Sequence, residues 1–191
     1  MLRLRHATPE AWKDTLRADL TGFLRDHAHN ERKVAGAALQ LATHNPHRSE
    51  MVRAMIALAQ EELEHFGQVH ELLLARGEHL GHEERDTYMG EMHKLLRRAD
   101  TDDYLLDRLL AFGIIEARGC ERFRMAAEAL AGDPLADFYW ELVRCEARHH
   151  QSFIAWARTY YGDAAVDARL DELLDAEAAI AAALPLRAAL H

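Results

Sequence analysis

The sequence is poor in residues that cross-link or interrupt a chain. Its 191 residues include only two cysteines, Cys120 and Cys145, and no Cys-x-x-Cys pair. Two cysteines are too few for a disulfide framework, and they provide no built-in rubredoxin-like electron carrier. There are 4 prolines and 10 glycines, and β-branched residues never alternate over the length of a strand. We therefore predict an all-α protein, with both thiols packed and reduced in the cytosol.

Long apolar runs and an excess of positive charge are also missing. No run of about 18 apolar residues exists, and residues 1–5 already contain two arginines in place of the apolar stretch of a signal peptide. We expect a cytoplasmic protein without a membrane partner. The formal net charge of −9 argues against a general nucleic-acid binder, because phosphate contacts need Lys and Arg. A local basic patch could still bind RNA.

Capping and stop signals divide the chain into helices. Thr8-Pro9-Glu10 is typical of a helix start, and Gly77 of a helix end. We predict long helices over about 8–43, with a break near 19–22, and over 49–76, 100–130 and 134–160. Shorter helices are expected at 88–98 and 164–184. No linker or low-complexity segment interrupts this pattern, so residues 1–191 are expected to form one domain with a sizeable core.

Two of the long helices carry the same pair of polar residues on an apolar stripe. At coiled-coil spacing, the stripe of helix 49–76 is apolar except at Glu62 and His65, and that of helix 134–160 is apolar or aromatic except at Glu146 and His149. Residues three apart lie about 60° apart on a helix, so both side chains of each pair can reach one ion.

The other two long helices each place one acid on the inner stripe, Glu31 in the first and Glu116 in the third. Glu31 precedes Glu62 by 31 positions, and Glu116 precedes Glu146 by 30 positions. This repeat predicts two helical hairpins related by a pseudo-twofold axis. In chain order the four helices offer Glu, Glu-x-x-His, Glu and Glu-x-x-His.

Four inward-facing carboxylates need compensating charge, because burying them alone is very costly. None of the four stripes carries Lys or Arg, whereas two dications would neutralise all four acids. Four Glu and two His are the ligand set of carboxylate-bridged di-iron and di-manganese bundles. Zinc prefers fewer ligands, so we expect two iron ions, with manganese as an alternative. The predicted metal ligands, which would also be catalytic through the metal, are Glu31, Glu62, His65, Glu116, Glu146 and His149.

The remaining polar and aromatic residues have plainer interpretations. His27 is expected to be a partly buried polar residue, with a supporting contact to Glu31 as the alternative. Glu61 and Glu64 are assigned to the polar side, and His150 to a position off the stripe. Phe112, Phe123 and Phe153 are candidate walls of a substrate cavity. Two basic groups are expected to be solvated faces, with RNA contact as the alternative; they are Lys94, Arg97, Arg98, Arg118, Arg122 and Arg124.

Four stretches of the sequence resemble the ferritin-like tRNA hydroxylases that act on 2-methylthio-N6-isopentenyl-adenosine, the MiaE family. They are HNERKVA at 29–35, QEELEHF at 60–66, IEARGCERF at 115–123 and CEARHH at 145–150. The resemblance covers roughly residues 8 to 180. The third stretch is the most specific, because ferritins and rubrerythrins do not generally share it.

This resemblance implies a ferritin-like four-helix bundle with extra short helices at the N-terminus, in the central crossover and at the C-terminus. It implies an O2-dependent di-iron monooxygenase that hydroxylates the isopentenyl side chain of adenosine 37 in tRNA, supplied with electrons by an external reductase. The family's ligands fall on the same six residues. The alternatives are a peroxidase, catalase or ferroxidase on this scaffold, a non-enzymatic iron store, and a purely structural helical module.

Overall fold

The computed structural model describes residues 2–191, and it confirms the all-α prediction. Over these residues the chain forms seven helices and no strand. The helices are α1 (Trp12–Ala18), α2 (Leu20–His44), α3 (Ser49–Leu74), α4 (Thr87–Lys94), α5 (Thr101–Ala129), α6 (Pro134–Tyr161) and α7 (Asp163–Ala183). Within this part of the chain, no helix is both long enough and apolar enough to cross a bilayer.

The helix boundaries follow the local signals. The predicted break near 19–22 is confirmed at Asp19, whose carboxylate accepts a hydrogen bond from the backbone N–H of Gly22 at 2.9 Å and so caps α2. Asp133 caps α6 in the same way ahead of Pro134. The α6–α7 corner is at Gly162, whose φ of 76° lies in the left-handed region that glycine adopts without a Cβ clash.

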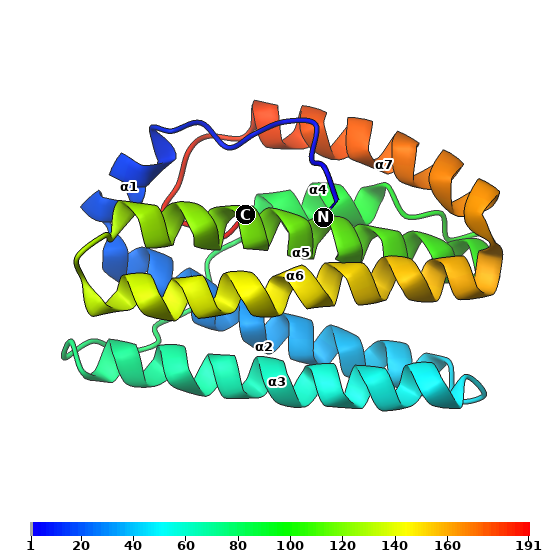
Figure 1. Ribbon diagram of the computed structural model, residues 1–191, viewed down its shortest axis with the longest axis horizontal. Helices are drawn as coiled ribbons and strands as arrows, with labels where there is room; N and C mark the ends of the chain where they lie inside the picture. Colours follow the sequence, from blue (N-terminus) through cyan, green and yellow to red (C-terminus); the bar gives the residue numbers. More distant parts are fainter. Residues whose placement is uncertain (1) are drawn as a thin grey trace. The chain divides into compact units, whose positions relative to one another are not determined.

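The chain divides into two compact units. The first unit comprises the residues up to Arg17, Asp86–Arg187 and His191; the second comprises Ala18–Arg85 and Ala188–Leu190. Each unit contains one of the two predicted hairpins: α5 runs along α6 in the first unit, and α2 along α3 in the second (Figure 1). The single domain inferred from the sequence stays a prediction.

The second unit is the α2–α3 hairpin and its C-terminal loop. Arg25 on α2 ties down that loop, because its guanidinium donates to the carbonyl of His79 and to the carboxylate of Glu78, both at 2.8 Å. The irregular segment 188–190 is fixed to the same helix, since the N–H of Leu190 donates to the carboxylate of Asp26 at 2.7 Å. The apolar stripes of both helices are buried.

In the first unit, α5 is buried around its whole circumference, because every residue from 105 to 120 is buried. One contributor is its close approach to α6 at Gly113, where an added Cβ would lie 2.8 Å from Cδ1 of Ile154 and 3.4 Å from the carbonyl oxygen of His150. The helix α7 also packs against α5 and α6. The outer face of α5, on the side away from its apolar stripe, is therefore also buried. The polar side chains on this face need hydrogen-bond or ionic partners within the protein.

Candidate metal centre

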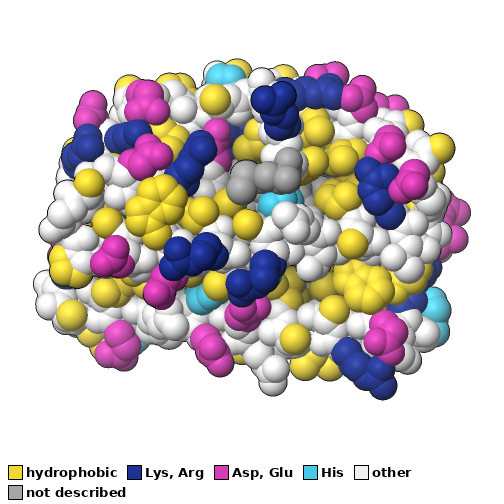
Figure 2. Space-filling view, viewed as in Figure 1, with side chains coloured by type: hydrophobic (Ala, Val, Ile, Leu, Met, Phe, Trp, Pro, Cys, Tyr) yellow, Lys and Arg dark blue, Asp and Glu magenta, His cyan; other side chains and the backbone are white. Residues whose placement is uncertain are grey.

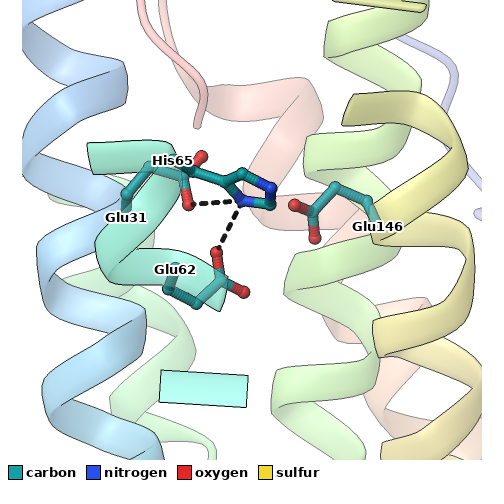
Figure 3. Close-up of side chains that lie close together, drawn as sticks. All are labelled: Glu31, Glu62, His65 and Glu146. Atoms are coloured by element: carbon teal, nitrogen blue, oxygen red, sulfur yellow. Dashed lines mark hydrogen bonds and ion pairs between the residues drawn. The ribbon is translucent and has the colours of Figure 1, made fainter. Parts of the chain in front are cut away.

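The hairpin of the second unit brings three of the predicted ligands together. Glu31 comes from α2, and Glu62 and His65 come from α3. Nδ1 of His65 lies 3.3 Å from Oε2 of Glu62 and 3.9 Å from Oε2 of Glu31, as the dashed lines of Figure 3 show. One donor atom from each of the three residues lies within 4.8 Å of the others. All three side chains are buried.

The hairpin of the first unit repeats this arrangement. Glu116 comes from α5, and Glu146 and His149 come from α6. Nδ1 of His149 lies 3.1 Å from Oε2 of Glu146. Again one donor atom from each residue lies within 4.8 Å of the others, and all three are buried. In both hairpins Nδ1 is the imidazole nitrogen that faces the acids, so the two clusters match in chemistry as well as in spacing.

The two clusters fit metal ions, because each offers two carboxylates and one imidazole in a buried environment. Glu62 has 0 % and Glu146 2 % of its surface exposed, and a carboxylate so far from water is stable only with charge compensation. Two carboxylates balance one dication. Carboxylate and imidazole donors together suit iron and manganese.

His27 is more closely involved than the sequence analysis expected. Its side chain is completely buried, and its Nε2 lies 2.6 Å from Oε1 of Glu31 one turn along α2. The expectation of a partly buried polar residue was therefore wrong, and the alternative contact to Glu31 is confirmed. Burial, followed by the neighbouring imidazole of His65, lowers the pKa of His27 to about 3, so the ring is neutral at physiological pH. The i, i+4 spacing to a predicted ligand was the signal for this contact.

His150 has a structural role next to a predicted ligand. It lies off the stripe as predicted, but it is buried, and its two ring nitrogens contact the carbonyl oxygen of Glu146 at 3.1 Å and the backbone N–H of Leu2 at 3.4 Å. Because the Leu2 N–H is a donor, Nε2 of His150 is the acceptor. This side chain fastens the N-terminal segment to α6.

The outer face of α5 carries a buried ionic cluster that no pattern in the sequence had indicated. Arg118, assigned to a solvated face, is only 1 % exposed, and that prediction was wrong. Its Nε and Nη2 donate to the two carboxylate oxygens of Glu177 on α7, at 2.9 and 3.1 Å. Nη2 also donates to the carbonyl of His6 at 2.7 Å, and Nη1 bonds Glu121. Tyr88 on α4 donates to Glu177 at 3.1 Å.

The charges in this cluster stabilise one another. Burial alone would lower the pKa of Arg118, but the carboxylates of Glu177 and Glu121 raise it above its ordinary value. Burial and the charge of Glu177 raise the pKa of Tyr88 well above 10, which keeps the phenol protonated as a donor. Arg118 lies two residues after Glu116, on the opposite face of α5. The cluster therefore fixes the rotation of α5 about its own axis, and α5 is the helix that carries the predicted ligand Glu116.

A second buried acid, Asp107, holds the loop after α4 and helix α7 to α5. It accepts hydrogen bonds from Arg97 and Arg169, the shortest at 2.7 and 2.8 Å. Arg97 is thus half-buried in an internal ion pair, contrary to the solvated role expected for it. Arg124 is exposed, as predicted.

An all-helical chain whose two hairpins each bury two carboxylates and a histidine has the fold and donor set of the carboxylate-bridged dimetal proteins. The family model described as tRNA-(MS[2]IO[6]A)-hydroxylase (MiaE) matches residues 2–191. The chain belongs to this family, and the resemblance found in the sequence is confirmed.

Individual relatives agree with this assignment. A tRNA 2-(methylsulfanyl)-N(6)-isopentenyladenosine(37) hydroxylase of Pseudomonas putida is 39 % identical over 170 residues, which cover 88 % of this chain and 81 % of the relative. The Salmonella typhimurium protein of the same name is 38 % identical over 116 residues, covering 61 % of this chain and 42 % of the relative.

Among solved structures, the chain is similar to "Protein 43 with aldehyde deformylating oxygenase activity" from Synechococcus. The TM-score is 0.91 at 33 % sequence identity, over 98 % of this chain and 93 % of the other. The ferritin-like fold class predicted from the sequence is confirmed by this match. The match is to an oxygenase, in accord with a buried metal centre.

Proposed function

We propose that this protein is a di-iron monooxygenase that hydroxylates the isopentenyl side chain of 2-methylthio-N6-isopentenyl-adenosine at position 37 of tRNA. The observation that carries the proposal is the match of the hydroxylase family over residues 2–191, in a chain that buries both of the carboxylate–histidine clusters such chemistry needs. The 39 % identity to the Pseudomonas putida hydroxylase, over most of both chains, supports the same substrate.

We propose that the chain is a single domain that holds two iron ions. The cluster of the second unit would supply Glu31, Glu62 and His65, and that of the first unit Glu116, Glu146 and His149. The charge balance supports two ions. Each cluster carries two buried carboxylates, so one dication bound in each cluster would neutralise that cluster. Manganese is compatible with the same donors.

Bound iron would supply the activation of O2 that an unactivated C–H bond requires. Overall, one oxygen atom enters the C–H bond and the other leaves as water, which consumes two electrons and two protons. The chain has no Cys-x-x-Cys pair for a rubredoxin-like centre, so we propose that a separate reductase delivers the electrons.

The protein's own contribution is to bind and orient the prenyl group and to exclude water. Phe112 and Phe153 stack with their ring centroids 5.3 Å apart, one turn from Glu116 and His149 respectively. Both are buried. This apolar pair is our candidate wall for the prenyl chain, because the transfer of an uncharged branched alkene from water to such a surface is favourable.

The tRNA itself has to be recognised by a protein of mixed surface charge. On the face drawn in Figure 2, Lys and Arg side chains mostly lie close to Asp and Glu side chains. Arg118 and Arg97 are engaged in internal ion pairs. The exposed members of those two basic groups, which are the better candidates for phosphate contacts, are Lys94, Arg98 and Arg124. Action on tRNA would place the protein in the cytoplasm, where free thiols such as Cys120 and Cys145 persist.

The test is nucleoside analysis of bulk tRNA from cells that make the isopentenyl nucleoside, with and without this gene. We expect the hydroxylated nucleoside only when the wild-type gene is present, and its loss in the Glu62→Gln variant. The Arg158→Met variant, changed at an exposed ion pair, is the matched control and should retain activity. An unchanged nucleoside profile combined with rapid turnover of hydrogen peroxide would instead support the peroxidase or catalase alternative.

A further inference from the structure

Four of the most exposed large apolar side chains in residues 2–191 belong to the hairpin of the second unit. Ile56, Leu63 and Leu74 on α3 are 44, 50 and 45 % exposed, and Leu39 on α2 is 45 % exposed. Isolated apolar residues are common on protein surfaces, whereas large ones gathered on one face indicate a surface that another molecule covers. The positions of these four residues around their helices show that they share a face.

On α3 the exposed apolar residues form a single stripe, which we call the outer stripe. Its members are four or seven residues apart, which is the spacing of a coiled-coil seam. Measured from Glu62 at 100° per residue, they lie about 80° to 120° around the helix, and they span about 33 Å along it. All are exposed or half-buried; they are Val52, Ile56, Leu63, His70 and Leu74.

Leu39 lies on the side of α2 that borders this stripe. In the hairpin of the first unit, the helices approach each other closely at Gly113 and Ile154, which lie about 60° and 80° around α5 and α6 from the predicted acids of those helices. Leu39 lies about 80° from Glu31 in the same sense, so the repeat places it on the groove between α2 and α3. A Cβ on Gly36 would meet nothing within 4 Å, so the groove is open beside Leu39.

The two hairpins differ in what covers them within their own units. In the first unit a third helix, α7, packs against both α5 and α6. The second unit, over residues 18–85 and 188–190, contains no third helix. Its loop after α3 is bound to α2 through Arg25 and Arg32, and it leaves the outer stripe exposed. The groove of this hairpin therefore has the surface for a packed helix, and no helix of its own unit fills it.

The charges along α3 make this face complementary to a second copy of itself. Arg53 lies near the start of the outer stripe, whereas Glu64 and Glu71 lie towards its end, and all three are exposed. A twofold axis beside Leu63, the midpoint of the stripe, makes two α3 helices antiparallel, so the basic start of each lies beside the acidic end of the other. The same pair of acids disfavours an RNA phosphate on this face.

We propose that the α2–α3 groove, formed by the outer stripe and Leu39, is the interface of a homodimer whose twofold axis passes beside Leu63. A face about 33 Å long and about 20 Å wide, the width of two packed helices, provides roughly 660 Å² per copy. The roughly 1,300 Å² buried by two copies together is within the range of specific interfaces. Leu63 meets its counterpart at the centre, where single residues contribute most to binding.

The experiment is sedimentation velocity of the full-length protein over a range of concentrations. For the wild type we expect a dimer of twice the 21.7 kDa chain mass. Leu63→Glu places two carboxylates at the axis and should raise the Kd of the dimer by at least about 100-fold. Because Leu63 is half exposed in the single chain, this variant should keep the helix content of the wild type by circular dichroism.

Trp140→Glu is the matched control. Trp140 lies six residues before Glu146, as Ile56 lies six residues before Glu62, and it is 38 % exposed. It is therefore the equivalent exposed apolar residue on the other hairpin, and its replacement by a carboxylate should leave the dimer intact.

Charge reversal tests the antiparallel arrangement. Arg53→Glu and Glu71→Arg should each weaken the dimer by about 5- to 10-fold, because each opposes like charges at both ends of the interface. The two changes combined should restore most of the affinity. Leu63→Cys should form an intermolecular disulfide under mild oxidation, whereas the wild type, with its Cys120 and Cys145, serves as the background for this reaction.

Several results would overturn the inference without touching the metal centre. They are a wild type that stays monomeric at every concentration, a dimer that Leu63→Glu leaves unchanged, and a dimer that Trp140→Glu disrupts equally. A double reversal of Arg53 and Glu71 as weak as the sum of the single reversals would refute the antiparallel arrangement. A monomeric wild type that binds tRNA or phosphatidylcholine vesicles, and loses this binding in Leu63→Glu, would assign the face to that other occupant.

Discussion

The buried pair of Arg118 and Glu177 provides a demanding test of how this fold is held together. The perturbation is Arg118→Met, which keeps the length and apolar stem of the side chain but removes its charge and all its donors. In the wild type both side chains are essentially inaccessible, at 1 % and 0 % exposure. The variant leaves the carboxylate of Glu177 buried without its guanidinium partner and retains only the hydrogen bond from Tyr88.

The expected loss follows from this burial. Removing one partner of a buried ion pair typically costs about 3–5 kcal/mol, because the remaining charge is left uncompensated. Glu177→Gln is milder, at about 1–3 kcal/mol, since Arg118 keeps Glu121 and the carbonyl of His6. The double variant has no uncompensated carboxylate on α7. We expect it to lose less than the sum of the single losses, by about 2 kcal/mol.

The assay is equilibrium urea unfolding of the wild type, the two single variants and the double variant. Arg158→Met is the control, because Arg158 pairs with Asp163 and Asp167 at the surface and should change the free energy of unfolding by less than about 1 kcal/mol. If Arg118→Met is no more costly than this control, or if the two single losses simply add, the cluster is not the internal anchor of α5 that its geometry indicates.

Two further predictions concern groups away from the metal centre. Burial alone would raise the pKa of Asp107, but hydrogen bonds from Arg169 and Arg97 hold this pKa below its ordinary value. The ionised carboxylate of Asp107 therefore contributes its full stabilisation of the folded state above about pH 4. This contribution is lost as the pH falls further and the carboxylate is protonated. The difference in unfolding free energy between wild type and Asp107→Asn should be about 3 kcal/mol at pH 7 and should shrink towards pH 3, and a difference independent of pH would refute this. Burial raises the pKa of Cys120 to about 11, so iodoacetamide at pH 8 should alkylate the partly exposed Cys145 of the folded protein and spare Cys120. Equal alkylation in a mass spectrum would contradict the burial of Cys120.

The predicted ligands were accessible to sequence reasoning because the signal was periodic. Glu62 with His65, and Glu146 with His149, interrupt otherwise apolar stripes at heptad spacing, and a buried carboxylate on such a stripe needs a cation. Each hairpin does gather its three predicted residues. Helix boundaries were also predictable within a few residues wherever a cap such as Asp19 or Asp133 was present.

The buried ionic cluster could not be predicted in the same way. Its members, including Arg118, Glu177, Tyr88 and His6, come from four separate segments of the first unit, and no local pattern links them. A helix with charged residues outside its apolar stripe is usually exposed to solvent on that side, so one face of α5 was expected to be solvent-exposed. That face is buried by α7 and by the N-terminal segment. Packing by segments that are distant in the sequence produces no periodic pattern in the sequence of α5 itself. The isolated Glu177 in an Ala-rich stretch was the only hint.

Metal stoichiometry by anaerobic Fe²⁺ titration of the purified chain, read by calorimetry and Mössbauer spectroscopy, tests the central claim most directly. We expect two iron ions per chain in the wild type, and loss of high-affinity binding when Glu62 and Glu146 are both changed to Gln. Binding of one ion or none by the wild type, or two ions held equally well by the double variant, would contradict the account.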